Sequence, residues 1–295
     1  MEIIYQDVDI TKNSTPLIRC ELDQYLSDHI DTMTVIFDNN EGSWTDWAPQ
    51  VGDKIRCKEE YCDSGNMYIH SIEPCENTMV LKAASLKYIK SGHTHTWENI
   101  HFKQLIDQRA SNLGLKVEYL GVTDQEYGAV EQDGSDLSFI NELCKLEGCG
   151  FMITDGILRV ISYDYMEKLP VSSYTINALK HRSHDMPYYT GCMVTDGMTY
   201  GKAGDETGEI VKLNTPHEIA SIAEANRFAE NALKYANFKR KYGEIYADTL
   251  LSTIRPGSKV KLKSDYWNKP IIVTHTRHEL RSMKSKIFFR LCREE

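Results

Sequence analysis

The chain has 295 residues, of which 41% are hydrophobic and 26% are charged, and its formal net charge at pH 7 is −9. This length exceeds one small core and predicts two or three globular domains. The negative charge argues against a general nucleic-acid-binding protein, which needs a cationic surface to release counterions. No apolar run approaches 18 residues and no charged-then-apolar leader occurs, so we expect neither a membrane span nor a signal peptide.

The cysteine pattern predicts free thiols rather than a metal site. None of the eight cysteines forms a Cys-x-x-Cys pair; they stand at positions 20, 57, 62, 75, 144, 149, 192 and 292. Tetrahedral zinc sites usually show such tight pairs. We therefore expect mostly buried, unpaired cysteines and folding in a reducing cytoplasm.

Two stretches near opposite ends of the chain, residues 47–58 and 254–263, follow the same plan. In each, a Gly opens a turn and apolar residues then alternate with cationic ones, a pattern typical of a strand that is buried on one face. A polar turn and a second strand follow in both copies, at residues 67–72 and 271–276. The likeness has two explanations, a chance similarity between common hairpins or two related β-barrel domains.

Residues 1–90 predict a first β-barrel. Strands are expected at residues 1–5, 17–22 and 33–38, in addition to the hairpin of the first copy. The turn after residue 38 carries Trp44 and Trp47. These two side chains are interpreted either as a lid on the barrel or as an exposed anchor for a neighbouring subunit or partner.

Residues 91–165 predict a small α/β module. One apolar face indicates a helix over residues 99–113 and another indicates a helix over 137–147, with Ser135 in the segment that caps it. A strand at 115–119 and a hairpin at 151–161, with Asp155-Gly156 at its turn, complete the module. We expect these strands to share one sheet with both helices on one face.

Residues 166–295 predict a second β-barrel with a long helix at about 216–236. Thr215 and Glu218 resemble a capping box, and an alanine-rich stripe follows. A strand is expected at residues 188–194, a glycine-rich loop at 200–209, and further strands at 243–251, 259–263, 271–276 and 286–291. The fold class is thus mainly β with an α+β insert, and the division leaves open an exchange of strands between segments.

No catalytic, cofactor-binding or metal-binding set stands out. The histidine pairs are His93 with His95, His181 with His184, and His275 with His278. His93 and His95 would face the same way on a strand, but no acidic or thiol partner lies at a telling distance, and His275 and His278, three residues apart in a strand, are expected to face opposite sides. Two carboxylates for cutting glycans remain open, because their spacing is set by the fold.

In three segments, within residues 37–53, 132–156 and 256–274, the chain resembles the bacteriophage late-control gene D family, the tail hub proteins of contractile-tailed phages, phage-like bacteriocins and the front part of VgrG proteins. Residues 37–44 followed by Pro49, Gly52 and Asp53 resemble the family's first barrel. Residues 132–140, 147–151 and 155–156 resemble its middle segment. Residues 256–260 and 272–274, together with Trp267, are similar to its second barrel.

The resemblance implies a non-enzymatic structural protein in which residues 1–90 and 166–295 form two tail-tube-like β-barrels. Three copies would form a homotrimer whose six barrels adapt a six-fold tail tube to a three-fold central spike. The implied partners are the tail tube protein, the spike protein and baseplate wedge or LysM-like tail proteins, with DNA only as passing cargo through an acidic lumen. Assembly is expected in the host bacterial cytoplasm, within the baseplate of a virion or tail-like particle, and any spike or hydrolase is expected to be a separate protein.

Two readings from other classes remain open. The first is a cell-wall (peptidoglycan) hydrolase, which would show a cleft with two carboxylates about 5–10 Å apart. The second is a glycan-binding tail protein, in which Trp44 and Trp47 would form an exposed aromatic platform. Particle mass separates the three readings, because only the hub is required to trimerise.

Overall fold

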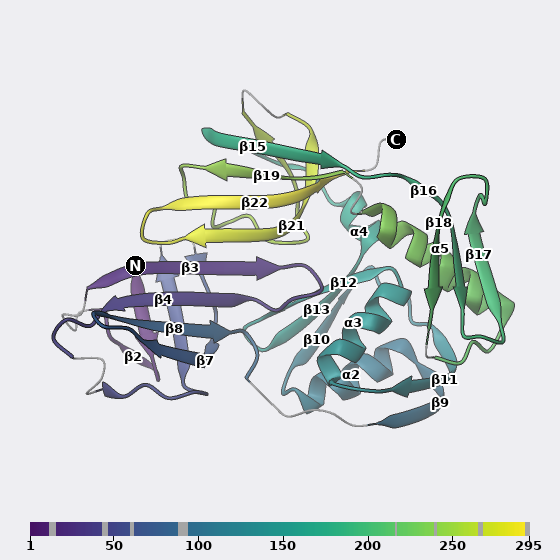
Figure 1. The fold of residues 1–295 in the computed structure, drawn as a ribbon, viewed down its shortest axis with the longest axis horizontal. Helices are drawn as coiled ribbons and strands as arrows, with labels where there is room; N and C mark the ends of the chain where they lie inside the picture. Colours follow the sequence, from purple (N-terminus) through teal and green to yellow (C-terminus); the bar gives the residue numbers. More distant parts are fainter. Residues whose placement is uncertain are drawn as a thin grey trace.

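The computed structural model describes residues 1–11, 16–42, 47–59, 62–87, 94–215, 217–238, 241–264 and 268–292. Its largest feature is one long sheet in which neighbouring strands follow the order β15-β19-β22-β21-β3-β4-β8-β7-β5-β1-β2. Figure 1 shows the first eight of these strands lying one below another. The predicted fold class, mainly β with a helical insert, is confirmed.

The first barrel contains strands from the amino-terminal part of the chain. They are β1 (Glu2–Tyr5), β2 (Val8–Asp9), β3 (Leu17–Tyr25), β4 (Thr32–Asp38), β5 (Lys54–Glu59), β6 (Cys62–Asp63), β7 (Met67–Pro74) and β8 (Thr78–Ala84). Alternate residues of these strands point inward, as period-two patterns require. The buried set forms one core that includes Cys20, Leu22, Val35, Phe37, Ile55, Met67 and Leu81.

The second barrel contains β14 (Ser172–Thr175), β15 (Ala178–Asp185), β19 (Lys241–Ala247), β20 (Lys259–Lys263), β21 (Pro270–Glu279) and β22 (Lys284–Leu291). Its core is separate from that of the first barrel and includes Ile245, Val260, Leu262, Val273, Ile287 and Phe289. The two repeated stretches of the sequence form β5 and β20, each followed by its hairpin partner, β7 or β21.

The strand order of the two barrels is the same. The first runs β1-β5-β7-β8-β4-β3 and the second runs β14-β20-β21-β22-β19-β15. The two orders match position by position when β1 is paired with β14, β5 with β20, β7 with β21, β8 with β22, β4 with β19, and β3 with β15. A chance likeness between two hairpins would not extend to six strands.

The match continues in single hydrogen bonds. The Gly52 amide donates to Ile69 O at 2.7 Å, and the Gly257 amide donates to Val273 O at 2.8 Å. Both glycines have positive φ, +94° and +81°, a conformation that other residues rarely adopt. The register also shifts at the same place in both copies, after Ile69 in β7 and after Val273 in β21.

One strand direction differs between the barrels. β1 pairs antiparallel with β5, whereas β14 pairs parallel with β20. The difference follows from how each strand is reached. β1 lies at the start of the chain and turns at Gln6 and Asp7 into β2, whereas β14 arrives from the α/β module at the other end of the barrel.

The module contains β9 (His95–His101), α2 (Phe102–Asn112), β10 (Lys116–Leu120), β11 (Glu126–Gln132), α3 (Asp136–Leu146), β12 (Cys149–Thr154), β13 (Ile157–Ser162) and α4 (Tyr163–Lys168). Ser135 caps α3, since its hydroxyl accepts a hydrogen bond from Ser138 N at 3.2 Å. The expectation that the strand at 115–119 and the hairpin at 151–161 share one sheet is confirmed, because β10, β13 and β12 form one sheet; β9 and β11, which were not predicted as strands, pair separately.

A second inserted segment lies between β15 and β19. It holds the sheet of β16 (Tyr189–Thr195), β17 (Tyr200–Gly204) and β18 (Glu209–Asn214), followed by α5 (Ile222–Phe238). The predicted glycine-rich loop is therefore partly strand. Its Gly201 and Gly204 let β17 approach α5 and β16 closely.

The long helix begins later than the sequence indicates. The Ser221 hydroxyl accepts from Glu224 N at 3.2 Å, while the Glu224 carboxylate accepts from Ala220 N at 2.8 Å. This reciprocal pair is a capping box one turn and a half after the predicted one. The Asp196 carboxylate accepts from Ile219 N at 2.8 Å, which ties the preceding segment to the end of β16 instead.

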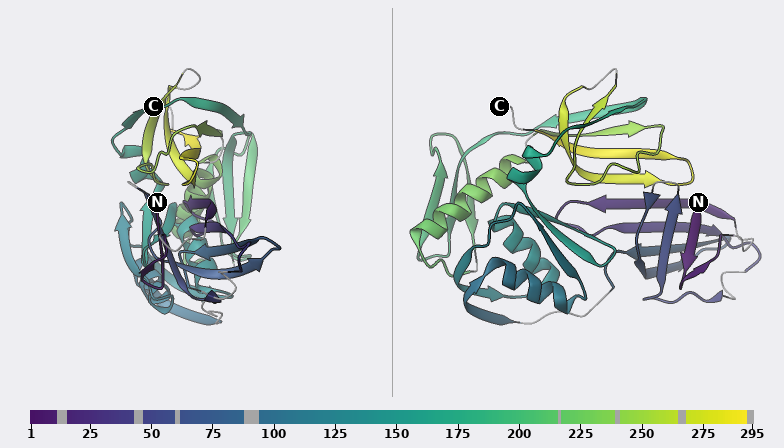
Figure 2. Two further views of the ribbon diagram at one scale, coloured as in Figure 1. Left: turned by 90° about the vertical axis from the view of Figure 1, so that its left-hand side faces the viewer. Right: turned by 180° about the vertical axis from the view of Figure 1, so that it is seen from behind.

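Both inserts leave the long sheet at the same end. The module follows the last residue of β8, and the β16–α5 segment follows the last residue of β15; Figures 1 and 2 show both on one side of the barrels. The opposite end carries short connections, at residues 75–77 between β7 and β8 and at residues 280–283 between β21 and β22.

Candidate functional site

The two barrels are joined by a backbone ladder between β3 and β21, which we call the seam. Five antiparallel pairs run from His275 opposite Tyr25 to Glu279 opposite Glu21. Hydrogen bonds from Leu26 N to Thr274 O and from Leu280 N to Cys20 O extend the ladder at both ends. Because β3 also pairs with β4, neither of its edges is open, and the barrels share one sheet.

An ion-pair network lies on the outer face of the seam. The Asp23 carboxylate accepts hydrogen bonds from Arg277 Nε at 2.8 Å and from His275 Nε2 at 2.6 Å. Glu21 lies 3.3 Å from the same Arg277 nitrogen. Burial alone would raise the pKa of Asp23, but the bonds from His275 and Arg277 outweigh it and lower that pKa below its usual value.

Aromatic rings stack across the same face. The His275 ring lies between the Tyr25 ring and the Phe288 ring, with centroid distances of 4.2 Å on both sides and interplanar angles of 8° and 18°. Lys286 Nζ stands over the Phe288 ring at 4.3 Å and also pairs with Glu244 at 2.7 Å. Stacking and ion pairing thus extend from β19 through β22 and β21 to β3.

The turn between β3 and β4 attaches the α/β module to the seam. Ser27 N donates to Phe151 O at 2.8 Å, and Phe151 N donates to the Ser27 hydroxyl at 3.2 Å. The buried Asp31 carboxylate accepts from Tyr25 N at 2.9 Å and from the Thr154 hydroxyl at 3.2 Å. Seam, turn and module are therefore connected by hydrogen bonds that cross about 125 residues of chain.

Asp31 makes the stability of this junction depend on pH. Burial raises its pKa from 3.8 to about 7, although the bonds from Tyr25 and Thr154 oppose the shift. The folded protein therefore keeps a proton that the unfolded chain releases, so this contribution is complete below pH 4 and is lost as pH rises through about 7. Between pH 5 and pH 8 we expect the wild type to lose about 2 kcal/mol of unfolding free energy through this group.

Asp31→Asn should remove that loss. Urea denaturation at pH 5 and pH 8 measures the difference, and the variant should gain stability relative to the wild type at the higher pH. Asp133→Asn, at an exposed carboxylate of the module, controls for the general loss of one charge. Equal slopes for the wild type and Asp31→Asn would contradict this role of Asp31.

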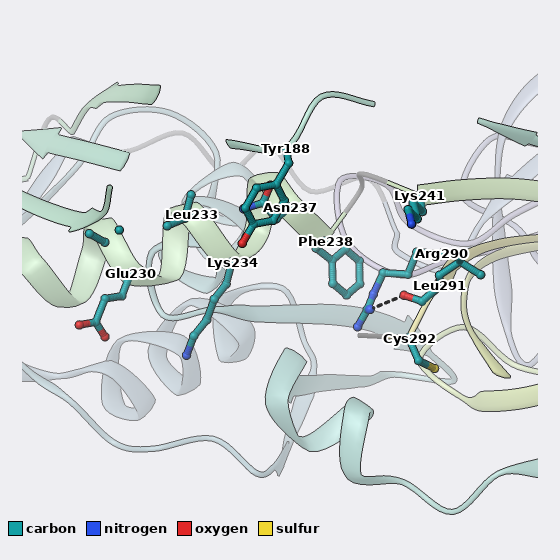
Figure 3. Close-up of a pocket in the computed structure, with 12 residues that line it drawn as sticks. Tyr188, Glu230, Leu233, Lys234, Asn237, Phe238, Lys241, Arg290, Leu291 and Cys292 are labelled. Atoms are coloured by element: carbon teal, nitrogen blue, oxygen red, sulfur yellow. Dashed lines mark hydrogen bonds between the residues drawn. The ribbon is translucent and has the colours of Figure 1, made fainter. Parts of the chain in front are cut away.

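A pocket of 670 Å³ lies where α5 meets β22, and Figure 3 shows the side chains that line it. Arg290 is held there by Glu167 at 2.5 Å and by Leu291 O at 2.9 Å, with its guanidinium 3.7 Å from the Phe238 ring centroid. Glu230 is the one carboxylate among the described lining residues. A glycoside hydrolase needs two, and burial raises the pKa of the Cys292 thiol, which is opposite to what a nucleophile requires.

The residues singled out in the sequence are dispersed. Trp47 is 37% exposed, and its ring meets Tyr5 edge-on at 5.2 Å between centroids. Trp44, His93 and Trp267 lie outside the described residues. His275 is at the seam while His278 is buried on the other side of β21, as the strand period predicted.

All eight cysteines are free, and six are buried. Sequence reasoning missed the seam, although Glu21 and Asp23 alternate along one strand, and His275, Arg277 and Glu279 along another. Such alternation is compatible with cross-strand pairing, but Asp23, Arg277 and Glu279 lie beyond the strand ends predicted at residues 22 and 276, so the sequence did not single it out.

Comparison with solved structures defines the class of fold. The chain is similar to a 43 kDa tail protein of prophage MuSo2 from Shewanella oneidensis, with a TM-score of 0.69, 10% identity and coverage of 99% of this chain and 98% of that one. It is also similar to a tail protein from Neisseria meningitidis MC58, with a TM-score of 0.76, 10% identity and coverage of 98% and 95%.

A third similar structure is the Escherichia coli protein c3393, a component of the type VI secretion system. Its TM-score is 0.65 at 10% identity, covering 100% of this chain and 78% of that one. No protein-family model and no curated protein matches the sequence. The chain thus has the fold of phage tail proteins, and the resemblance drawn from its sequence is confirmed at the level of the fold.

Within the part of the chain that the structure describes, no helix combines the length and the apolar character that a bilayer crossing requires.

Proposed function

We propose that this protein is the structural hub of a contractile phage tail or phage-tail-like bacteriocin. Three copies form a ring that adapts the six-fold tail tube to the three-fold central spike. The observation that carries the proposal is the pair of barrels with one strand order in a single continuous sheet. Three copies of two equivalent barrels present six similar surfaces, so the change of symmetry follows from duplication within the chain.

In this ring the outer face of the long sheet lines the lumen. Its charges are largely paired, as in Arg277 with Asp23 and Lys286 with Glu244. A lumen lined by these pairs would carry charges of both signs, within a chain whose net charge is −9. A surface without an excess of one sign binds DNA weakly, which suits a channel through which DNA passes as cargo.

The proposal includes the partners and the division of the chain. Residues 1–90 and 166–295 form the tube-like barrels and residues 91–165 form the module between them. The ring contacts the tail tube protein, the spike protein and wedge or LysM-like tail proteins, and it assembles in the host cytoplasm before it enters the particle. The loop with Trp44 and Trp47 contacts a neighbouring subunit, which is supported by the exposure of the Trp47 ring.

Particle mass tests the proposal. Light scattering coupled to size exclusion should give three times the 33.9 kDa chain mass, and electron microscopy should show a ring with a central opening. A protein that stays monomeric at high concentration and with tube protein added contradicts the hub. Replacing Trp44 and Trp47 together by Ala should lower the trimer fraction without unfolding the monomer, whereas Met198→Ala, at a side chain that is 95% exposed elsewhere, should not.

A further inference from the structure

The long sheet ends in an open strand, β15. Among the described residues β15 pairs with β19 alone, and residues 182–185 are exposed. Its counterpart in the first barrel is β3. There the equivalent residues 21–24 are covered, because β21 pairs with that edge. One barrel therefore has a partner strand at the edge where the other has solvent.

The second half of β7 is open in a complementary way. β5 pairs with β7 only at Met67 and Tyr68, so residues 71–74 lack a neighbour on that side in the described structure. The counterpart of this half-strand is the stretch of β21 that pairs with β3. Thr276 and His278 are fully buried there, whereas their equivalents Ile72 and Pro74 are half-buried and exposed.

We infer that β15 of one copy pairs antiparallel with the second half of β7 of the next copy, repeating the seam between subunits. The inference rests on the proposed ring and identifies the two strands that close it. A closed ring of six equivalent barrels needs six equivalent junctions, of which the seam supplies three and this pairing the other three.

The seam also fixes the register of the new pairing. β15 pairs with β19 in the same way as β3 pairs with β4, with the same register shift near the start of the strand. Glu21 therefore corresponds to Arg182, and Asp23 to His184. By the equivalence of β7 and β21, Arg277 corresponds to Glu73. Transferring the seam pairs places Met186 opposite Ser71, Asp185 opposite Ile72, His184 opposite Glu73, Ser183 opposite Pro74 and Arg182 opposite Cys75 of the neighbouring copy.

The acidic and basic residues are on opposite strands in the two junctions. In the seam, the cation Arg277 of β21 lies against the acids Asp23 and Glu21 of β3. In the inferred junction, the acid Glu73 of β7 lies against His184 and Arg182 of β15. Each edge strand is thus complementary to its own partner and repels the edge of the other junction, which favours assembly in one order.

Pro74 makes the inferred ladder weaker than the seam. Cys75 N donates to Thr78 O, so alternate amides of β7 point toward β8 and those of positions 72 and 74 point to the open edge. Proline has no amide hydrogen, and a proline at such a position is tolerated on an edge strand and deters random strand addition. The junction therefore forms one hydrogen bond fewer, and we expect ring closure to stabilise it.

A single substitution tests the register. Arg182→Cys places a thiol opposite the exposed native Cys75, in a pair whose Cα atoms are about 4.5 Å apart on one face of the sheet, close enough for a disulfide. Oxidation of Arg182→Cys should yield a covalent trimer on a non-reducing gel. Peptide mass spectrometry should find Cys75 linked to the introduced thiol, and dithiothreitol should reverse the link.

Two controls share the fold and the exposed strand. Adding Cys75→Ser to Arg182→Cys should abolish the link, and Ser183→Cys, whose side chain lies on the other face of β15, should not form it. A wild type that is trimeric by light scattering, with no link in Arg182→Cys, would overturn the strand pairing and leave the hub intact. A monomeric wild type without the link would overturn both. Disulfide-linked oligomers without a distinct trimer would support the strand pairing and contradict the three-fold ring.

Discussion

Gly201→Ala should detach α5 from the sheet beneath it and give one of the largest losses of stability in the chain. A Cβ at Gly201 in β17 would lie 2.0 Å from Ala225 C and 2.3 Å from Ala225 O. These are backbone atoms of α5, so no side-chain rotation relieves the clash. The helix also contributes Phe228 and Ala229 to the module core, which must shift with it. We expect a loss of about 3 kcal/mol, read from urea denaturation.

Gly208→Ala is the matched control, because it adds the same methyl group near the same small sheet. There the nearest atoms belong to the Thr190 side chain, which can rotate. The control should cost clearly less than Gly201→Ala. Equal losses for the two variants would show that close packing of α5 against β17 is not what sets the effect.

Asp23→Lys should open the seam. Asp23 is 8% exposed, and the substitution would place a buried cation against Arg277 and His275. An unpaired charge at a buried position costs about 3–5 kcal/mol, and the 44% exposed Arg277 places the expected cost at the lower end of that range. The expected result is a loss of that size in unfolding free energy, with faster proteolysis between the barrels, because the seam is the ladder that joins them.

Glu118→Lys is the control for Asp23→Lys. Glu118 also pairs with an arginine, Arg159, at 2.7 Å, but the two side chains are 49% and 36% exposed. Water screens such a surface pair, so its loss should cost less than about 1 kcal/mol. A similar loss for both variants would argue against a special role of the seam. Combining Asp23→Lys with Arg277→Asp should recover part of the stability, since opposite charges again face each other.

The strands that form the barrel cores could be predicted because their alternation of buried and exposed residues is visible in the local sequence. In β5 and β20 a glycine turn is followed by strict alternation, and both strands lie close to where the sequence placed them. β21 was predicted to end near Thr276 yet continues to Glu279. Its last residues are polar, with Arg277 exposed, His278 buried and Glu279 half-buried, so no alternation of apolar residues marked them.

Segments whose partners are distant in sequence were the hardest to predict. β9 is exposed and polar over most of its length and is a strand because it pairs with β11. The start of α5 was misplaced because Thr215 and Glu218 match a capping box as well as Ser221 and Glu224 do. The contact of Ile219 with Asp196, set by the tertiary fold, decides between them.

The seam lay beyond sequence reasoning for the same reason. Asp23 and Arg277 are 254 residues apart, and charged residues on a strand indicate only a face toward solvent. Trp44 and Trp47 were predicted as an interface because large aromatic residues are unusual in a polar loop. The pairs that join the barrels are ordinary residues that gain their importance from position.

The placement of both inserts at one end of the barrels gives the proposed ring two unlike rims. One rim carries the short β7–β8 and β21–β22 hairpins at equivalent places, so three chains display six comparable turns around it. The other rim bears three modules and three copies of α5, each occurring once per chain. A tube protein with six-fold periodicity would find matching contacts on the rim with the hairpins, and a trimeric spike would find them on the rim with the modules and α5. The orientation of the ring between tube and spike would then be determined by the positions of the two inserts, after β8 and after β15.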